Sequence, residues 1–234
     1  NSSGGTEIGG GIVAGTVLHE DLEPCAFAGP IPGMGAIVVD EAGNRVGAGQ
    51  VGELALSVPS IGLTRGFWND PQRYVESYWS KIPGLWVHGD FASIDTRGRW
   101  YIHGRSDDTI KIAGKRTGPA EIEAALLATG KVAEAVAVGV PDALKGSAVV
   151  CVCVPSRHAA ADADLADELR SAVVEALGSS FRPKSVLFVA DIPKTRTMKI
   201  MRRLVRSVLM HEPEGDLSGL VNPDSLEALR KTVG

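Results

Sequence analysis

The sequence has few cysteines and no long apolar run. Three cysteines in 234 residues are too few for a disulfide framework. Cys151 and Cys153 stand two residues apart, so an extended chain would place both side chains on one face, which suits neither a disulfide nor a metal site. We interpret both as buried core residues of a cytoplasmic protein. The apolar run at 148–154 is far too short to span a bilayer and predicts a buried strand.

The charge balance gives no support for a polyanionic partner. The chain has 28 acidic and 24 basic residues, a formal net charge of −4. We therefore predict no nucleic-acid partner and no membrane partner. The basic residues between Lys194 and Arg206 are interpreted as a solvated helix face. No secretory signal is recognisable at the start, and the chain begins at Asn1 without a methionine, from which we expect that an upstream part is missing.

The region before residue 106 favours β-structure. Short apolar stretches alternate with glycine-containing turns, which indicates a small sheet or barrel. Asp70 and Pro71 suit an N-cap and a first helical position, and they predict a helix that runs to about Lys81. His88 and His103 lack metal-ligand spacing. The expected strands cover 36–39, 52–58, 85–90 and 98–103.

The region after residue 105 alternates between helix and strand signals. The strongest helix signal covers 162–177, where leucine and valine recur every four residues. This pattern predicts a compact α+β domain, separate from the β-rich part, so the fold class is α+β. The other expected elements are strands at 136–140, 148–154 and 186–189, and helices at 119–128, 199–210 and from Pro223.

Residues 104–123 combine charged side chains with residues that bend the chain. Their pattern predicts a loop, a strand, a tight turn, a second strand and a helix that begins at Pro119. Asp107 and Asp108 are adjacent, and neighbours in an extended chain point to opposite sides, which argues against an acid–base pair. Residues 1–16 are rich in glycine and hydroxyl groups. They suit either close backbone approach to a ligand or a flexible end.

Four segments stand out together: Gly5–Glu7, Trp86–Asp90, Gly104–Glu123 and Pro193–Arg203. In this order, they resemble signature motifs of the adenylate-forming (AMP-binding) enzyme superfamily. The nearest branch is the acyl-CoA synthetases of the acetyl-CoA synthetase type, and the resemblance covers nearly the whole chain. It implies that 1–105 are the distal part of a large N-terminal AMP-binding domain, a β-rich and barrel-like remnant. It also implies that 106–234 are the compact, mobile carboxyl-terminal lid domain.

The resemblance implies a ligase that works in two steps. A carboxylic acid and ATP form an acyl-adenylate and pyrophosphate, and the thiol of coenzyme A then displaces AMP. The implied cofactors are ATP, Mg²⁺ and coenzyme A, and the implied substrate is a short- to medium-chain carboxylic acid. Because an anionic carboxylate must approach an anionic phosphate, such an enzyme needs donors and cations where charge develops.

The resemblance places the nucleotide on several residues of both regions. Thr6 would donate to the α-phosphate, and Glu7 is a hard oxygen ligand suited to Mg²⁺. Asp90 would accept both ribose hydroxyls, with Arg105 as a second ribose contact. The residues implied for ATP and AMP are Gly5, Thr6, Asp90, Ile102 near the adenine, Arg105, and Arg116 at a phosphate.

Lys199 matches the mobile lysine that bridges carboxylate and phosphate oxygens in the adenylation step. The alternative interpretation is an ordinary solvated lysine on a basic helix. The resemblance also implies regulation by a lysine acetyltransferase and deacetylase acting on Lys199. Thr197 and Met198 replace the usual small residues before this lysine, which we expect to stiffen its approach and to alter acetyltransferase recognition.

The resemblance assigns the hinge between the two domains to Asp107. After adenylation the small domain would rotate, withdraw Lys199 and present Ala113 and Gly114 to the pantetheine arm of coenzyme A. Gly114 lacks a β-carbon, so a thiol-bearing arm could pass close to the backbone. Some of the basic residues near Lys199 could meet coenzyme A phosphates.

Two further sites follow from the resemblance. Gly4 stands where acetate-specific relatives carry a bulky aromatic residue, so we expect a larger acyl pocket and an acid longer than acetate. The backbone carbonyls of Leu127 and Val132 match a cation-binding turn, although Thr129 replaces the usual histidine there.

Three alternatives remain open on the sequence. The chain also resembles acetoacetyl-CoA synthetases at 3–6, and an adenylating domain of the peptide synthetase or luciferase type would share its fold. A stand-alone binding module that has lost catalysis is the alternative from another class, and the retained site residues argue against it. Since the phosphate loop and most of the acyl pocket would lie upstream of Asn1, we expect this chain alone to be inactive.

Overall fold

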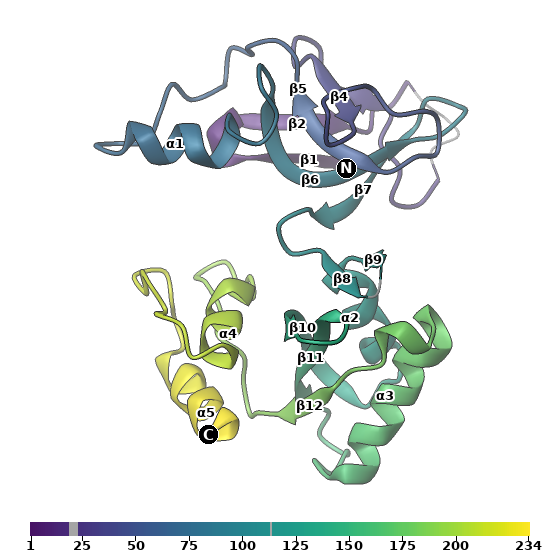
Figure 1. Ribbon diagram of the computed structural model, residues 1–234, viewed down its shortest axis with the longest axis vertical. Coiled ribbons are helices and arrows are strands. Elements are labelled where there is room, and N and C mark those ends of the chain that lie inside the picture. The colour runs from purple at the N-terminus through teal and green to yellow at the C-terminus, as the bar shows by residue number, and fades with distance from the viewer. Residues whose placement is uncertain (19–22, 113) are drawn as a thin grey trace. The chain divides into compact units, whose positions relative to one another are not determined.

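A computed structural model describes residues 1–18, 23–112 and 114–234 (Figure 1). The chain forms two compact units, Asn1–Asp107 and Asp108–Gly234. The fold is α+β, as expected. No helix within the described residues is long and apolar enough to cross a membrane.

The first unit is built on an antiparallel sheet with the strand order β4-β5-β6-β7. A second sheet has the order β1-β2-β3. Side chains such as Ile8, Leu54 and Trp86 are fully buried between these elements, so the amino-terminal residues belong to the core of this unit. The bounds are β1 Ser2–Gly5, η1 Thr6–Ile8, β2 Gly10–Ala14, β3 Gly29–Pro30, β4 Ala36–Val39, β5 Gly52–Leu56, β6 Trp86–Ile94 and β7 Trp100–Arg105.

Helix α1 (Pro71–Tyr78) begins where the sequence predicted and ends three residues before Lys81. The Asp70 carboxylate accepts a hydrogen bond from the Arg73 amide at 3.2 Å, as an N-cap does. Its aromatic side chains pack into the unit, with the ring of Tyr78 stacked on that of Trp86 at 4.7 Å. These aromatic side chains therefore belong to the core of the first unit.

The second unit is a sheet covered by helices on both faces (Figure 1). Strand β10 pairs antiparallel with β11, and β11 pairs parallel with β12. Successive side chains of a strand point to opposite faces of the sheet. Cys151 and Cys153 therefore pack against α2 and α3, whereas Val152 packs towards α4 and α5. The bounds are α2 Pro119–Ala128, β10 Val132–Asp142, β11 Gly146–Pro155, α3 Ala163–Leu177, η2 Ser179–Phe181, β12 Ser185–Phe188, α4 Arg202–Leu209 and α5 Pro223–Val233.

The two neighbouring cysteines are fully buried and unbonded, as predicted. Burial raises the pKa of both thiols, that of Cys153 to about 12. They are therefore inert core residues at neutral pH.

The segment before α4 departs from the prediction of a helix over 199–210. The helix begins only at Arg202. Met198 has a φ of 62°, and Lys194 and Ile200 form an antiparallel bridge, so Lys199 lies in a hairpin-like loop. We call residues 194–200 the lysine loop. Ile200 is held by the bridge to Lys194, so the helix can begin only after it, which accounts for the later start.

Candidate functional site

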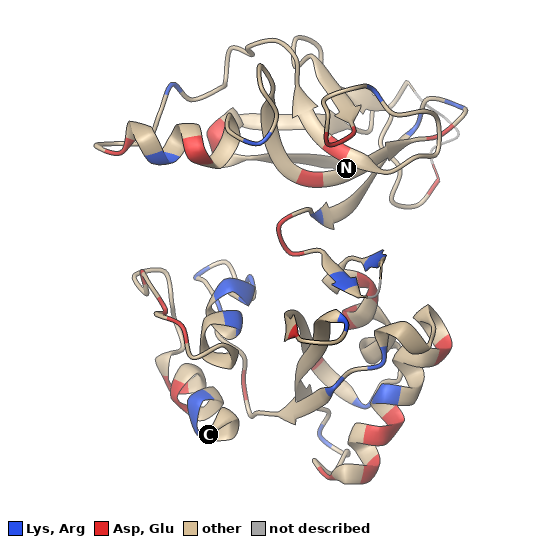
Figure 2. Cartoon of the chain, in the orientation of Figure 1, with Lys and Arg blue, Asp and Glu red and all other residues tan. Residues whose placement is uncertain are grey.

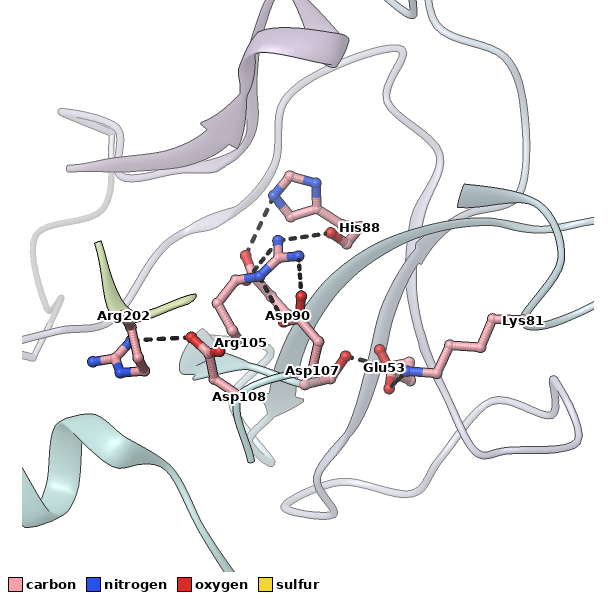
Figure 3. A network of polar contacts seen from close by, with 9 residues as sticks. Glu53, Lys81, His88, Asp90, Arg105, Asp107, Asp108 and Arg202 are labelled. Atoms are coloured by element: carbon pink, nitrogen blue, oxygen red, sulfur yellow. Dashed lines mark hydrogen bonds and ion pairs between the residues drawn. The ribbon is translucent and has the colours of Figure 1, made fainter. Parts of the chain in front are cut away.

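Asp90 and Arg105 face each other across strands β6 and β7 (Figure 3). The Asp90 residue is 8% exposed, and its Oδ1 lies 3.7 Å from Nη1 of Arg105. The same Nη1 donates to the carbonyl of His88 at 3.0 Å. The antiparallel register thus brings together the two residues that were predicted to contact ribose.

His88 joins this pair to the amino-terminal segment. Its Nε2 lies 3.3 Å from Oδ2 of Asp90. A β-carbon placed on Gly5 would lie 3.0 Å from Cε1 of His88 and 3.6 Å from Oε2 of Glu7. The predicted residues Gly5, Glu7, Asp90 and Arg105 therefore meet around one imidazole. We call these five residues the His88 cluster.

Burial favours the neutral form of the His88 imidazole. It is 7% exposed and stacks on Trp86 with ring centres 5.5 Å apart. Burial lowers the pKa of His88, and Arg105 lowers it further, whereas the carboxylates of Asp90 and Glu7 act in the opposite direction. In the sequence, His88 lacks metal-ligand spacing and was therefore not predicted to have a functional role. Its place two residues before Asp90, within a motif, was the only available signal.

Glu7 lies in η1 and is partly buried. Burial raises the pKa of Tyr78, and the carboxylate of Glu7 raises it further, which places this carboxylate beside the Tyr78 hydroxyl. Thr6 is exposed next to it. Ile102 lies in β7, partly buried against the core of the first unit.

Gly4 has a structural reason to be glycine. A β-carbon on Gly4 would lie 2.1 Å from the carbonyl oxygen of Gly10, because β1 and β2 approach closely. Its effect on an acyl pocket stays a prediction.

Asp107 and Asp108 bind different arginines. Asp107 accepts two hydrogen bonds from Arg105, at 2.9 and 3.0 Å. Asp108 accepts one at 3.0 Å from Arg202 (Figure 3). Arg202 also donates to Glu123 at 2.6 Å. Burial by itself would raise the pKa of Asp107, but Arg105 reverses this effect and lowers it.

Lys199 is exposed in the lysine loop. The interpretation of the surrounding basic residues as one solvated helix face is wrong. Lys194 is only 5% exposed and pairs with Glu134 and Asp191, and Arg202 is half-buried against carboxylates.

A basic hairpin precedes α2, formed by β8 (Ile110–Ile112) and β9 (Lys115–Thr117). Figure 2 shows its lysine and arginine positions in blue. Arg116 is exposed and pairs in register with Lys111. Gly114 has a φ of 82°, and a β-carbon there would meet no described atom within 4 Å. Ala113, predicted to contact coenzyme A, lies outside the described residues.

The predicted cation turn follows α2. The carbonyl of Leu127 accepts a hydrogen bond from the Gly130 amide at 3.0 Å, and Val132 begins β10. The described part of the chain contains no group of three His, Cys, Asp or Glu side chains that could hold a metal ion. Cation binding by the two carbonyls stays a prediction.

Comparison with known proteins places these features in a family. Residues 121–199 match the AMP-binding enzyme C-terminal domain. The chain is 40% identical over 228 residues to the acetyl-coenzyme A synthetase of Pyrobaculum arsenaticum. The alignment covers 97% of this chain and 34% of that one. The chain belongs to the adenylate-forming enzymes. It is also 37% identical over 226 residues to the acetyl-coenzyme A synthetase of Methanothrix thermoacetophila, covering 95% of this chain and 34% of that one. The chain thus spans about a third of the length of these relatives.

Solved structures of adenylate-forming enzymes share this fold. The acetoacetyl-CoA synthetase of Streptomyces lividans superposes with a TM-score of 0.86 at 28% identity, over 99% of this chain and 35% of that one. ATP-bound MatB of Rhodopseudomonas palustris superposes with a TM-score of 0.72 at 28% identity, over 87% of this chain and 39% of that one. The resemblance drawn from four sequence motifs is therefore confirmed.

Proposed function

We propose that the chain is part of an AMP-forming acyl-CoA synthetase, an acid–thiol ligase. The complete enzyme converts a carboxylic acid, ATP and coenzyme A to acyl-CoA, AMP and pyrophosphate through an acyl-adenylate. The observation that carries the proposal is the His88 cluster, in which residues from three separate segments converge. Similarity to acetyl-coenzyme A synthetases over nearly the whole chain supports the reaction class.

The His88 cluster provides a ribose and phosphate site. Asp90 accepts the ribose hydroxyls, while Arg105 and His88, which lie beside its two oxygens, orient its carboxylate. Ile102 lies against the adenine and the exposed Thr6 hydroxyl donates to the α-phosphate. Arg116 contacts a phosphate from the basic hairpin of the second unit.

Glu7 fits a magnesium ligand. Its partly buried carboxylate lies in the same cluster, and Mg²⁺ is commonly bound by one or two carboxylates together with substrate phosphates and water. When bound, the ion would neutralise phosphate charge that develops during adenylation.

The second unit acts as the mobile lid, with its pivot at Asp107. In the first half-reaction Lys199 donates to the carboxylate and phosphate oxygens. In the second, Ala113 and Gly114 border the pantetheine arm, where the open space around Gly114 admits it. The exposure of Lys199 also suits modification by an acetyltransferase and removal of the acetyl group by a deacetylase. The buried free thiols support a cytoplasmic location.

The acid is short to medium in length. Acetoacetate is the second candidate, because the acetoacetyl-CoA synthetase superposes over 99% of the chain. The deciding experiment measures thioester formation by the complete protein with acids from acetate to octanoate and with acetoacetate. Absence of thioester with every acid, in folded protein, would reject the proposal.

The chain alone should lack adenylation activity, since it spans about a third of its relatives. ATP–pyrophosphate exchange measures this directly. Exchange by the 234-residue chain would contradict the expectation. A non-catalytic binding module of the same fold would instead bind AMP without any exchange in the complete protein.

A further inference from the structure

Lys194 is a buried lysine at the base of the lysine loop. Its side chain is 6% exposed, and Nζ lies 2.7 Å from Oε2 of Glu134. It also contacts the carboxylate of Asp191. Glu134 comes from β10, so this ammonium ties the loop to the central sheet of the second unit.

Asn222 completes the arrangement just before α5. Its Nδ2 donates to Oδ2 of Asp191 at 2.6 Å and to the carbonyl of Ile192 at 2.8 Å, while its Oδ1 accepts from the Lys194 amide at 2.9 Å. The Val221 amide donates to the Lys194 carbonyl at 3.1 Å. The side chain and both backbone groups of Lys194 are therefore fixed.

The fixed base connects directly to Lys199. The Thr195 amide donates to the Lys199 carbonyl at 2.9 Å, and the Thr195 hydroxyl accepts from the Lys199 amide at 3.2 Å. The Met201 amide donates to the carbonyl of Pro193 at 2.9 Å. Movement of Lys194 would thus be transmitted to Lys199 through one residue.

The ammonium stays charged in this setting. Burial lowers the pKa of Lys194, but contacts with Asp191 and Glu134 outweigh that effect, so the pKa is raised overall. A buried ion pair of this kind adds little net stability compared with apolar packing, whereas it can specify one geometry.

We propose that Lys194 is a positioning residue that holds Lys199 in place for adenylation. The inference rests on the proposed function, in which Lys199 acts in the first half-reaction only. Lys194 cannot touch substrate from its buried place, so it acts through the lysine loop. A misplacement of the loop by about 1 Å would reduce adenylation by about 10- to 100-fold.

The test uses Lys194→Met in the complete enzyme, with Lys184→Met as the control. Lys184 is an exposed lysine of the same unit, paired only with Asp142 at 3.3 Å among the described residues. For Lys194→Met we expect kcat for adenylation to fall by about 10-fold or more, with little change in KM for ATP. Thioester formation from supplied acyl-adenylate should stay within about twofold. Equal losses in both half-reactions, or no loss in either, would overturn the proposal.

A structural readout separates this proposal from the proposed function. Hydrogen–deuterium exchange of the 234-residue chain should show faster exchange at 195–201 in Lys194→Met, and unchanged exchange in α3. Unchanged exchange at 195–201 would overturn the proposal. If the unsubstituted complete enzyme forms no acyl-adenylate, the proposed function fails while the exchange result still decides whether Lys194 holds the loop.

A second variant guards against misfolding. Lys194→Met leaves two carboxylates without their cation, which is strongly destabilising. Combining it with Glu134→Gln and Asp191→Asn removes these charges. The triple variant should fold and still show the selective loss of adenylation. Full adenylation activity in the folded triple variant would contradict the proposal.

Discussion

Asp107 and Asp108 are neighbours in the chain, yet their carboxylates bind arginines of different units. Asp107 is held by Arg105 of the first unit, and Asp108 by Arg202 of the second. Each unit therefore fixes one side of the peptide that joins the two. A rotation of the lid would be concentrated at this link, since hinge motion concentrates in a few residues.

Asp107→Pro should trap one state of the proposed cycle. Proline fixes φ near about −65° and restricts the preceding residue as well, so the link could no longer rotate freely. We expect one half-reaction of the complete enzyme to be retained and the other to be lost. Separate assays of adenylation and of thioester formation from supplied acyl-adenylate measure this. Full activity in both would reject Asp107 as the hinge.

Lys199→Ala should reduce adenylation by about two or more orders of magnitude, the effect of removing one transition-state donor. Thioester formation from supplied acyl-adenylate should be spared. Lys145→Ala, at an exposed lysine in the turn after β10, is the matched control. Equal loss of both half-reactions in Lys199→Ala would count against its assigned role.

The stability of the first unit should fall as the pH is lowered below about 6.5, the ordinary pKa of histidine. The pKa of His88 is lowered in the folded state, chiefly by burial. The unfolded chain therefore binds a proton first, which favours unfolding from that pH down to the lowered folded pKa. His88 of the folded chain is protonated only at lower pH, and below that pH the loss of unfolding free energy stops growing.

All four tryptophans lie in the first unit, so tryptophan fluorescence during urea unfolding reports on it alone. His88→Gln should flatten the pH dependence between about pH 7 and about pH 5.5, a window that includes the ordinary histidine pKa of about 6.5. His158→Gln, at an exposed histidine of the second unit, should leave the tryptophan-detected pH dependence unchanged. If the unfolding free energy depended on pH equally in His88→Gln and in the unsubstituted chain, His88 would not be the source of this pH dependence.

Local patterns were sufficient for the helices and strands of the core. The alternation around Cys151 and the cap at Asp70 depend on neighbouring residues, and both predictions were confirmed. Lys194 was misjudged because its partner Glu134 is distant in the sequence, and a basic run gives no sign of such a partner. The role of His88 was missed for the same reason: its contact with the Gly5 segment forms only in the folded unit.

Gly5→Ala tests whether the His88 cluster is as tightly packed as its geometry indicates. Gly5 has an extended backbone that alanine can adopt, so any effect is steric. The new methyl group would lie 3.0 Å from Cε1 of His88, closer than carbon atoms normally approach, so the imidazole would have to shift. We expect the first unit to lose about 1–3 kcal/mol of unfolding free energy, the usual cost of overpacking.

The control for this substitution is Gly10→Ala, because a β-carbon on Gly10 meets no described atom within 4 Å. Fluorescence-detected unfolding gives the free energies, and the complete enzyme should show a raised KM for ATP in Gly5→Ala only. Adding His88→Ala to Gly5→Ala removes the clashing ring, so the two destabilisations should be less than additive. If the two changes in unfolding free energy were strictly additive, Gly5 and His88 would not be in close contact. The His88 cluster would then lose the contact that joins the amino-terminal segment to Asp90.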